Sequence, residues 1–202
     1  MKTSYLLLGV ALIAFAGPVH PGTAQPSQER LIHRLPVEQN EPVKITEVKV
    51  NGQSVSFDKK FVAADDWLRS LAVSIKNKSD KLILFASIQL QFPRSPESKE
   101  RISVSTLSTG NAALEMRVPT PEEKLIGIGP GETADIQISV QEFVGLREFL
   151  NATGYPASIH IINLRINRVI FQDDTMWRGG TSLLRDSKVP GKWTPSDLVG
   201  IK

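Results

Sequence analysis

The sequence predicts a mainly β fold, an antiparallel β-sandwich with one short amphipathic helix. Apolar and polar residues alternate with period two over most of 71–92, a pattern typical of strands with one face in a core. Turn residues recur between the short apolar runs, and one segment has the apolar spacing of a helix. We therefore expect two layers of short strands, a helix over about 141–151 and an irregular C-terminal tail.

The first 24 residues have the layout of a secretory signal peptide. Lys2 supplies a positive start, an unbroken apolar run covers 6–16, and Gly22-Thr23-Ala24 is a small-residue cleavage pattern. We predict cleavage near Ala24 and a secreted or periplasmic mature chain. The apolar run is too short for a stable anchor, and no second run approaches the roughly 18 residues of a spanning helix. We therefore expect no membrane span.

The rest of the chain divides into three parts. Residues 25–42 are polar, contain three prolines and have no sustained apolar period, which predicts a flexible leader. Residues 43–184 carry the strand pattern and should form one β-sandwich domain, which is long enough to bury a core. Residues 185–202 contain Pro and Gly at short intervals and are expected to be irregular.

The clearest strand pattern lies on either side of the turn 77–80. Residues 71–76 and 83–92 alternate in polarity, so they form either a β-hairpin or a connection between sheets. Pro93 ends the second strand because it cannot donate to the ladder. One face of these strands should pack inward while the other meets water.

Other turns punctuate weaker strands. Asn51-Gly52 predicts a hairpin because both residues accept positive φ, with 55–57 as the returning strand. The glycine-rich stretch 127–131 lacks the Gly-Lys-Ser/Thr end of a phosphate-binding loop, so we interpret it as a tight turn before a strand. The remaining expected elements are strands at 102–107, 114–118 and 158–171, the last bent near Ile162-Asn163, a turn at 172–175, a short strand at Met176-Trp177 and a break at Gly179-Gly180.

The helix is predicted by its ends as well as by its apolar stripe. Ser139 and Glu142 have the spacing of a capping box, in which each side chain accepts a hydrogen bond from a backbone N–H at the helix start. Gly154 and Pro156 then end the helix. Its apolar stripe consists of Phe143, Leu146, Phe149 and Leu150.

Short strands, frequent turns and a single helix favour an immunoglobulin-like sandwich. Four segments resemble a group of uncharacterised secreted bacterial proteins that are themselves similar to immunoglobulin-like accessory domains. The resemblance spans roughly 44–193 and implies secretion and fold, but no functional residue, because the group has no assigned activity. The four segments are 65–68 (DDWL), 73–81 (VSIKNKSDK), 130–132 (PGE) and 170–180 (IFQDDTMWRGG).

Composition excludes several kinds of site. The chain has no cysteine, so it has no disulfide, no thiol nucleophile and no cysteine-based metal centre. Its formal net charge is +3 without a basic run, so we expect no nucleic-acid partner. The histidines His33 and His160 are far apart, and a Gly-x-Ser-x-Gly elbow is absent. We therefore expect no catalytic residue, no cofactor and no metal.

Two tryptophans and two aspartates are the candidate ligand-binding residues: Trp177, Trp193, Asp173 and Asp174. Planar tryptophan rings stack on sugars, although packing in a core is their usual role. We expect Trp67 and Trp177 to be buried and Trp193 to be exposed. The aspartate pair supplies only part of the six to eight oxygens that calcium takes, so a turn is favoured over a calcium site.

These observations favour a secreted, non-enzymatic module that binds a protein or polysaccharide at the cell envelope. A carbohydrate-binding module that uses an exposed tryptophan is the first alternative. An enzyme with an unfamiliar site is the least favoured, because the chain offers few bases and nucleophiles.

Overall fold

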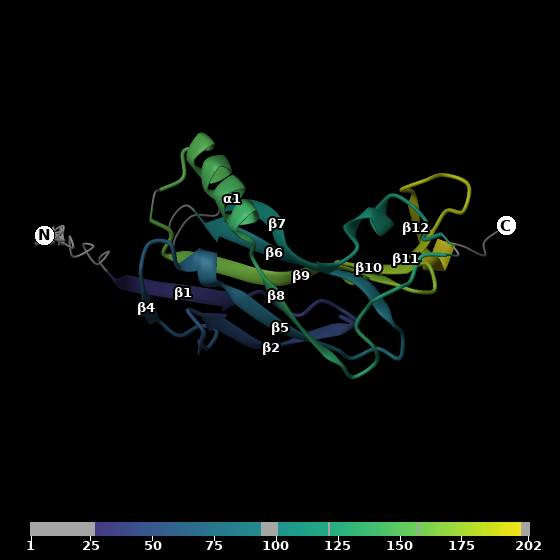
Figure 1. The fold of residues 1–202 in the computed structure, drawn as a ribbon, viewed down its shortest axis with the longest axis horizontal. Helices are drawn as coiled ribbons and strands as arrows, with labels where there is room; N and C mark the ends of the chain where they lie inside the picture. The colour runs from purple at the N-terminus through teal and green to yellow at the C-terminus, as the bar shows by residue number, and fades with distance from the viewer. Residues whose placement is uncertain (1–26, 94–100, 121, 157, 199–202) are drawn as a thin grey trace, which may run out of the picture.

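The computed structural model describes residues 27–93, 101–120, 122–156 and 158–198. The predicted signal peptide lies outside these residues. Two β-sheets pack face to face, and one α-helix lies at the end of the molecule opposite β12 (Figure 1). The mainly β prediction is confirmed. Within the described residues, no helix combines the length and apolarity needed to cross a membrane.

The larger sheet has eight strands arranged around β9 (Ile161–Phe171). The other seven are β1 (Gln28–Arg34), β4 (Phe61–Ala63), β6 (Ile83–Pro93), β7 (Arg101–Gly110), β10 (Thr175–Arg178), β11 (Thr181–Arg185) and β12 (Trp193–Pro195). Along one side β9 pairs with β6, which in turn pairs with β7. Along the other side, the first part of β9 pairs with β1 and the last part with β10. β4 extends the sheet beyond β1, and β11 and β12 extend it beyond β10.

The smaller sheet contains β2 (Val43–Val50), β3 (Gln53–Ser54), β5 (Ala72–Asn77) and β8 (Thr133–Gln137). Its order is β3-β2-β5-β8, and every neighbouring pair is antiparallel. Asn51 and Gly52 make the predicted turn, with φ of 52° and 74°. The returning strand is 53–54 rather than 55–57. The turn before β8 also forms as predicted, with Gly131 at φ 76°.

The core lies between the two sheets. Buried apolar side chains of both sheets form one cluster, which includes Trp67 and Trp177 as predicted. Burying a single isoleucine or leucine stabilises a fold by about 1.5–3 kcal/mol, so this cluster is the main source of stability. Its central members are Val73, Ile75, Ile88, Leu90, Ile136, Ile162, Leu164 and Ile166.

The turn between β5 and β6 connects the two sheets and does not close a hairpin. β5 belongs to the smaller sheet and β6 to the larger one. Asn77, which is fully buried, holds the connection together. Its Nδ2 donates to the carbonyls of Lys81 at 2.8 Å and Ile128 at 2.9 Å, and its Oδ1 accepts from the backbone N–H of Ser79 at 2.9 Å.

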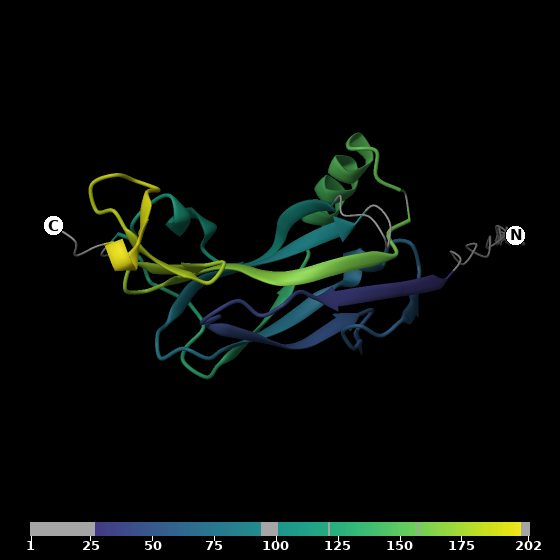
Figure 2. The ribbon, with the colours of Figure 1, turned by 180° about the vertical axis from the view of Figure 1, so that it is seen from behind.

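The predicted flexible leader is wrong for residues 28–34, which form β1. This strand pairs in parallel with β9, with Leu31 opposite Ile161, so the sandwich is not wholly antiparallel (Figure 2). The sequence of this segment lacks the apolar alternation of a buried strand, because one of its two buried residues is charged. Arg30 is 1% exposed and Ile32 is 0% exposed.

Three further expectations are corrected. The segment predicted as a strand at 114–118 begins with a 3-10 turn, η2 (Ala112–Glu115), because the Asn111 side chain caps the backbone N–H of Ala113. The tail is partly regular, since β12 pairs with β11 and is followed by η3 (Ser196–Leu198). The irregularity in β9 falls at Asn167, where the pairing with β6 skips one residue.

The outward face of β6 is also less open to water than its alternation predicts. Ser87 and Gln91 point away from the shared core, yet they are 2% and 8% exposed. β6 is an interior strand between β7 and β9, and Arg165 of β9 reaches across to it. The guanidinium Nε of Arg165 donates to Gln89 Oε1 at 2.7 Å.

The helix α1 (Val140–Ala152) agrees with its predicted ends. The Ser139 Oγ accepts from the Glu142 N–H, and Glu142 Oε2 accepts from the Ser139 N–H at 2.8 Å, which completes the capping box. At the other end Gly154 has φ of 73°. The N–H of Tyr155 then donates to the Leu150 carbonyl at 2.9 Å, a Schellman arrangement. Leu146 and Leu150 are buried in the core.

Candidate functional site

The two candidate aspartates lie in the turn between β9 and β10, and both are paired with cations of the chain. Asp173 Oδ2 is 2.6 Å from Lys81 Nζ, and Asp174 Oδ1 accepts from Arg185 Nε at 3.0 Å. Partial burial by itself raises the pKa of Asp173, but hydrogen bonds from Lys81 and Thr175 outweigh it and leave the pKa below its ordinary value. The described part of the chain contains no group of three or more metal-ligating side chains.

The two candidate tryptophans serve the fold. Trp177 is 4% exposed, and its Nε1 donates to the Gln39 carbonyl at 3.0 Å. The expectation of an exposed Trp193 is wrong, because this residue is half-buried and lies beneath the Arg185 guanidinium, 4.2 Å from the ring centre. Its Nε1 donates to the Glu115 carbonyl at 3.0 Å. The Trp193 face under Arg185 is therefore not available to a sugar.

Arg185 explains why these residues gather at one end of the molecule. Its side chain is 4% exposed, and it donates to the carbonyls of Leu114 at 2.7 Å and Arg117 at 2.9 Å. These bonds hold η2 over a second, smaller apolar cluster. Its buried members are Leu84, Phe85, Leu114, Ile170 and Met176, and Trp193 packs against it.

A polar cluster around the buried Arg30 contains a serine, a histidine and an aspartate. The Arg30 guanidinium donates to Asp65 Oδ1 at 2.5 Å, to Ser158 Oγ at 2.9 Å and to the Ile159 carbonyl at 3.0 Å. His160 Nδ1 lies 3.3 Å from the same guanidinium. The side chain of Arg30 is fully buried, whereas Asp65 keeps contact with solvent.

The hydrogen bonds of this cluster differ from those of a nucleophile and its base. Ser158 Oγ donates to Asp65 at 2.7 Å, so its proton points to a carboxylate and not to an imidazole. The hydrogen bond from Ser158 and that from Arg30 both lower the pKa of Asp65. The cluster joins β1, the residues before η1 (Trp67–Ser70) and the residues just before β9. Its hydrogen bonds therefore connect segments that are far apart in the sequence and stabilise the fold.

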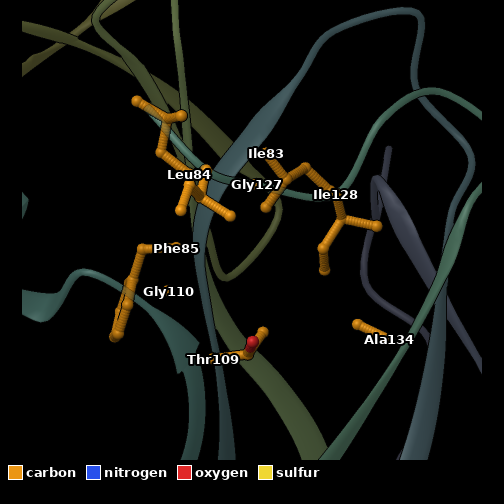
Figure 3. Close-up of a pocket in the computed structure, with 9 residues that line it drawn as sticks. Ile83, Leu84, Phe85, Thr109, Gly110, Gly127, Ile128 and Ala134 are labelled. Carbon is orange, nitrogen blue, oxygen red and sulfur yellow. The ribbon is translucent and has the colours of Figure 1, made fainter. Parts of the chain in front are cut away.

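An apolar cavity of about 170 Å³ lies at the seam between the two sheets (Figure 3). Two glycines allow the chain to approach the start of β6 closely. A Cβ on Gly110 would lie 2.0 Å from the Leu84 carbonyl oxygen, and one on Gly127 would lie 2.1 Å from that of Ile83. No charged side chain lines the cavity, which contains Ile83, Leu84, Phe85, Thr109, Gly110, Ile126, Gly127, Ile128 and Ala134.

A polar groove of about 410 Å³ crosses the larger sheet at the junction of β6, β9, β10 and β11. We call it the β9–β10 groove. Gln89 and Arg165 alternate along their strands with core residues, so they point away from the smaller sheet. The groove is lined by Gln89, Arg165, Ile166, Asn167, Arg178, Gly179, Thr181 and Leu183.

Arg178 is the lining residue that the fold does not use. It is exposed, and within the described ranges its side chain makes no hydrogen bond or ion pair. Its cross-strand partner is Arg168, and like charges placed directly opposite each other are destabilising. Burial, and then the charge of Arg178, lower the pKa of Arg168. Glu115 forms an ion pair with Arg168 and not with Arg178, so Arg178 has no counterion in the described part of the chain. Among the same residues, the buried Nε of Arg168 has no hydrogen-bond partner.

The groove was missed in the sequence because its residues come from four strands. The sequence shows that residues 87, 89 and 91 alternate with apolar residues, and that 163, 165 and 167 are polar. It does not show that the two sets lie side by side, because this depends on the register between β6 and β9. Comparison with known proteins adds no further guide, since no family model, curated protein or solved structure matches the chain.

Proposed function

We propose that this protein is a secreted or periplasmic, non-enzymatic module that binds a protein or polysaccharide at the cell envelope through the β9–β10 groove. The signal-peptide layout of residues 1–24 supports export. The sequence resemblance to secreted bacterial proteins supports the same location.

The observation that carries the proposal is Arg178, unpaired among the described residues, in the polar lining of the β9–β10 groove. Its volume of about 410 Å³ is within the range of ligand pockets. Arg178 keeps its full hydrogen-bonding capacity there, while the like charge of Arg168 faces it across the strands. Such a local conflict, retained without an internal counterion, is expected at functional sites.

The other polar groups support binding rather than chemistry. Asp173, Asp174 and the Arg30 cluster are all engaged in ion pairs within the fold. The hydroxyl of Ser158 is directed at a carboxylate, so the cluster lacks the arrangement of an activated nucleophile.

We further propose that the fold is immunoglobulin-like. The chain crosses repeatedly between the two sheets: β1 is in the larger sheet, β2 and β3 in the smaller, β4 in the larger, β5 in the smaller and β6 in the larger. Repeated crossing between two sheets around one core supports a sandwich of this kind.

The test is to fill the groove and measure retention on isolated envelopes. Thr181 is exposed in the groove, so Thr181→Trp places a large ring there without burying a polar group. Thr133→Trp is the matched control, at an exposed position of β8 in the smaller sheet. We expect the wild type and Thr133→Trp to sediment with envelopes and Thr181→Trp to remain in solution. Equal sedimentation of all three proteins would contradict binding through the groove.

A further inference from the structure

We infer that the ligand of the β9–β10 groove is an acidic polysaccharide whose carboxylates pair with Arg165 and Arg178. The inference rests on the binding function proposed above and names the ligand class. It follows from the charge of the groove, from the spacing of its arginines and from its position on the sheet.

The lining of the groove is cationic and has no acidic side chain. Arg178 has no partner among the residues described. Arg165 donates from Nε to Gln89 Oε1 at 2.7 Å, and its Nη1 lies 3.8 Å from Glu38 across partly exposed side chains. A solvated contact of that length contributes little, so an incoming carboxylate can replace it. Both guanidinium groups present the planar fork that binds a carboxylate through two hydrogen bonds.

The spacing of the two arginines favours a ligand with repeated charges over a single small anion. Arg178 is opposite Arg168, which is three positions beyond Arg165 on β9. The pairing with β6 skips Asn167, so Arg165 and Arg168 lie opposite Gln89 and Ser87, two positions apart on β6. At about 3.3 Å per residue, the side chains of Arg165 and Arg178 start roughly 7 Å apart along the strand direction, on neighbouring strands. The hydroxyl of Thr181 lies in the same groove, as do the amides of Gln89 and Asn167, which also bond within the sheet, and such groups suit a hydroxyl-rich chain.

The position of the groove favours a polysaccharide over a peptide. Extended peptides bind sheets by pairing with a free strand edge. The groove lies over β9 and β10, which have paired neighbours on both sides, so their backbone groups are not available. Its apolar lining residues are the buried Ile166 and the half-buried Leu183, which leave no deep pocket for an anchoring side chain. Recognition there depends on side-chain donors.

The test uses polygalacturonate and its fully methyl-esterified form, which share a backbone and differ in charge. Affinity gel electrophoresis should show that polygalacturonate retards the wild type and that the ester does not, with retardation falling as salt rises. Arg178→Gln should weaken binding at least about 10-fold, because it removes charge-assisted hydrogen bonds. Arg178→Lys should recover part of the affinity, since the charge remains and the fork is lost.

Arg69→Gln is the matched control, because it removes the same charge at an exposed position of η1, near α1 at the other end of the molecule. It should bind like the wild type. Equal weakening by Arg69→Gln and Arg178→Gln, or equal retardation by the ester, would overturn the inference. Arg178 makes no hydrogen bond or ion pair among the described residues and faces the like charge of Arg168, so Arg178→Gln should melt at or above the wild-type temperature. Thr181→Trp provides a second block of the same groove.

The two proposals fail differently. If the wild type sediments with envelopes in a Thr181-dependent way but ignores polygalacturonate, the binding function stands and the acidic ligand is wrong. If envelope sedimentation is absent and polygalacturonate is not bound, both are wrong.

Discussion

Arg30 illustrates how a charged residue can belong to a core. Its side chain is fully buried, and each side of the guanidinium has an acceptor: Asp65, Ser158 Oγ and the carbonyls of Ala63 and Ile159. Burying a charge is costly unless it is paired and hydrogen-bonded. Here Asp65 pairs with Arg30 while keeping contact with solvent, which reduces the cost of the pair.

The Asp65 carboxylate should make stability depend on pH. Hydrogen bonds from Ser158 and Arg30 hold its folded pKa below the ordinary value of 3.8. A lowered pKa contributes stability that is complete above the unfolded pKa and is lost as the pH falls through the folded pKa. We expect Asp65→Asn to be less stable than the wild type between pH 5 and 7, with the difference narrowing below about pH 4. Urea unfolding at several pH values measures it, and a difference that stays constant down to pH 2 would contradict this role.

At the scale of elements, the predictions that succeeded depended on neighbouring residues. The capping box at Ser139, the Asn51-Gly52 turn and the Gly179-Gly180 break act over two to four positions, so the sequence displays them directly. β1 was missed because its structure depends on β9, with partners 130 positions away. The same reason left open whether β5 and β6 form a hairpin.

The cap of α1 gives one prediction at this scale. Ser139→Ala removes the acceptor for the Glu142 N–H, and loss of an N-cap costs about 1 kcal/mol. Ser182→Ala, at an exposed position of β11, is the control and should change stability by less than about 0.5 kcal/mol. Urea denaturation compares the two, and equal free energies of unfolding would show that the cap contributes nothing.

The strand β1 gives a second prediction. Ile32 is 0% exposed, so Ile32→Ala should cost about 2–5 kcal/mol of unfolding free energy. A flexible leader would lose nothing from the same change. Val62→Ala, on the adjacent β4 and 68% exposed, is the matched control and should be nearly neutral. Thermal melts of both variants distinguish a structural strand from a leader.

At the scale of the whole molecule, the fold has two cores of unequal size. The large cluster joins the two sheets, and the small one lies under η2 at the end formed by β10, β11 and β12. Few buried groups secure this end, so it should open locally before the rest of the structure. The β9–β10 groove lies on the larger sheet, and its four strands are brought together only by the complete pairing of that sheet. That is why the fold class could be predicted from the sequence but the groove could not.

Arg185 should control opening of the small core. Arg185→Gln loses hydrogen bonds to the carbonyls of Leu114 and Arg117 and the contact with Trp193. We expect hydrogen exchange to accelerate at least about 10-fold in η2 and β12 and to stay unchanged in β6 and the first half of β9. Acceleration throughout the sheet would show that the two cores unfold as one.

The parallel pairing of β1 with β9 affects how the chain matures. A polypeptide that emerges from a ribosome or a translocon with its N-terminus first exposes β1 long before β9. Leu31 meets its partner Ile161 only after 130 further residues have followed. Closure of such a long loop is slow, so the larger sheet is completed after most of the chain has emerged. The N-terminal strand therefore stays unpaired with β9 until late in synthesis, an order of assembly that is compatible with the export proposed above.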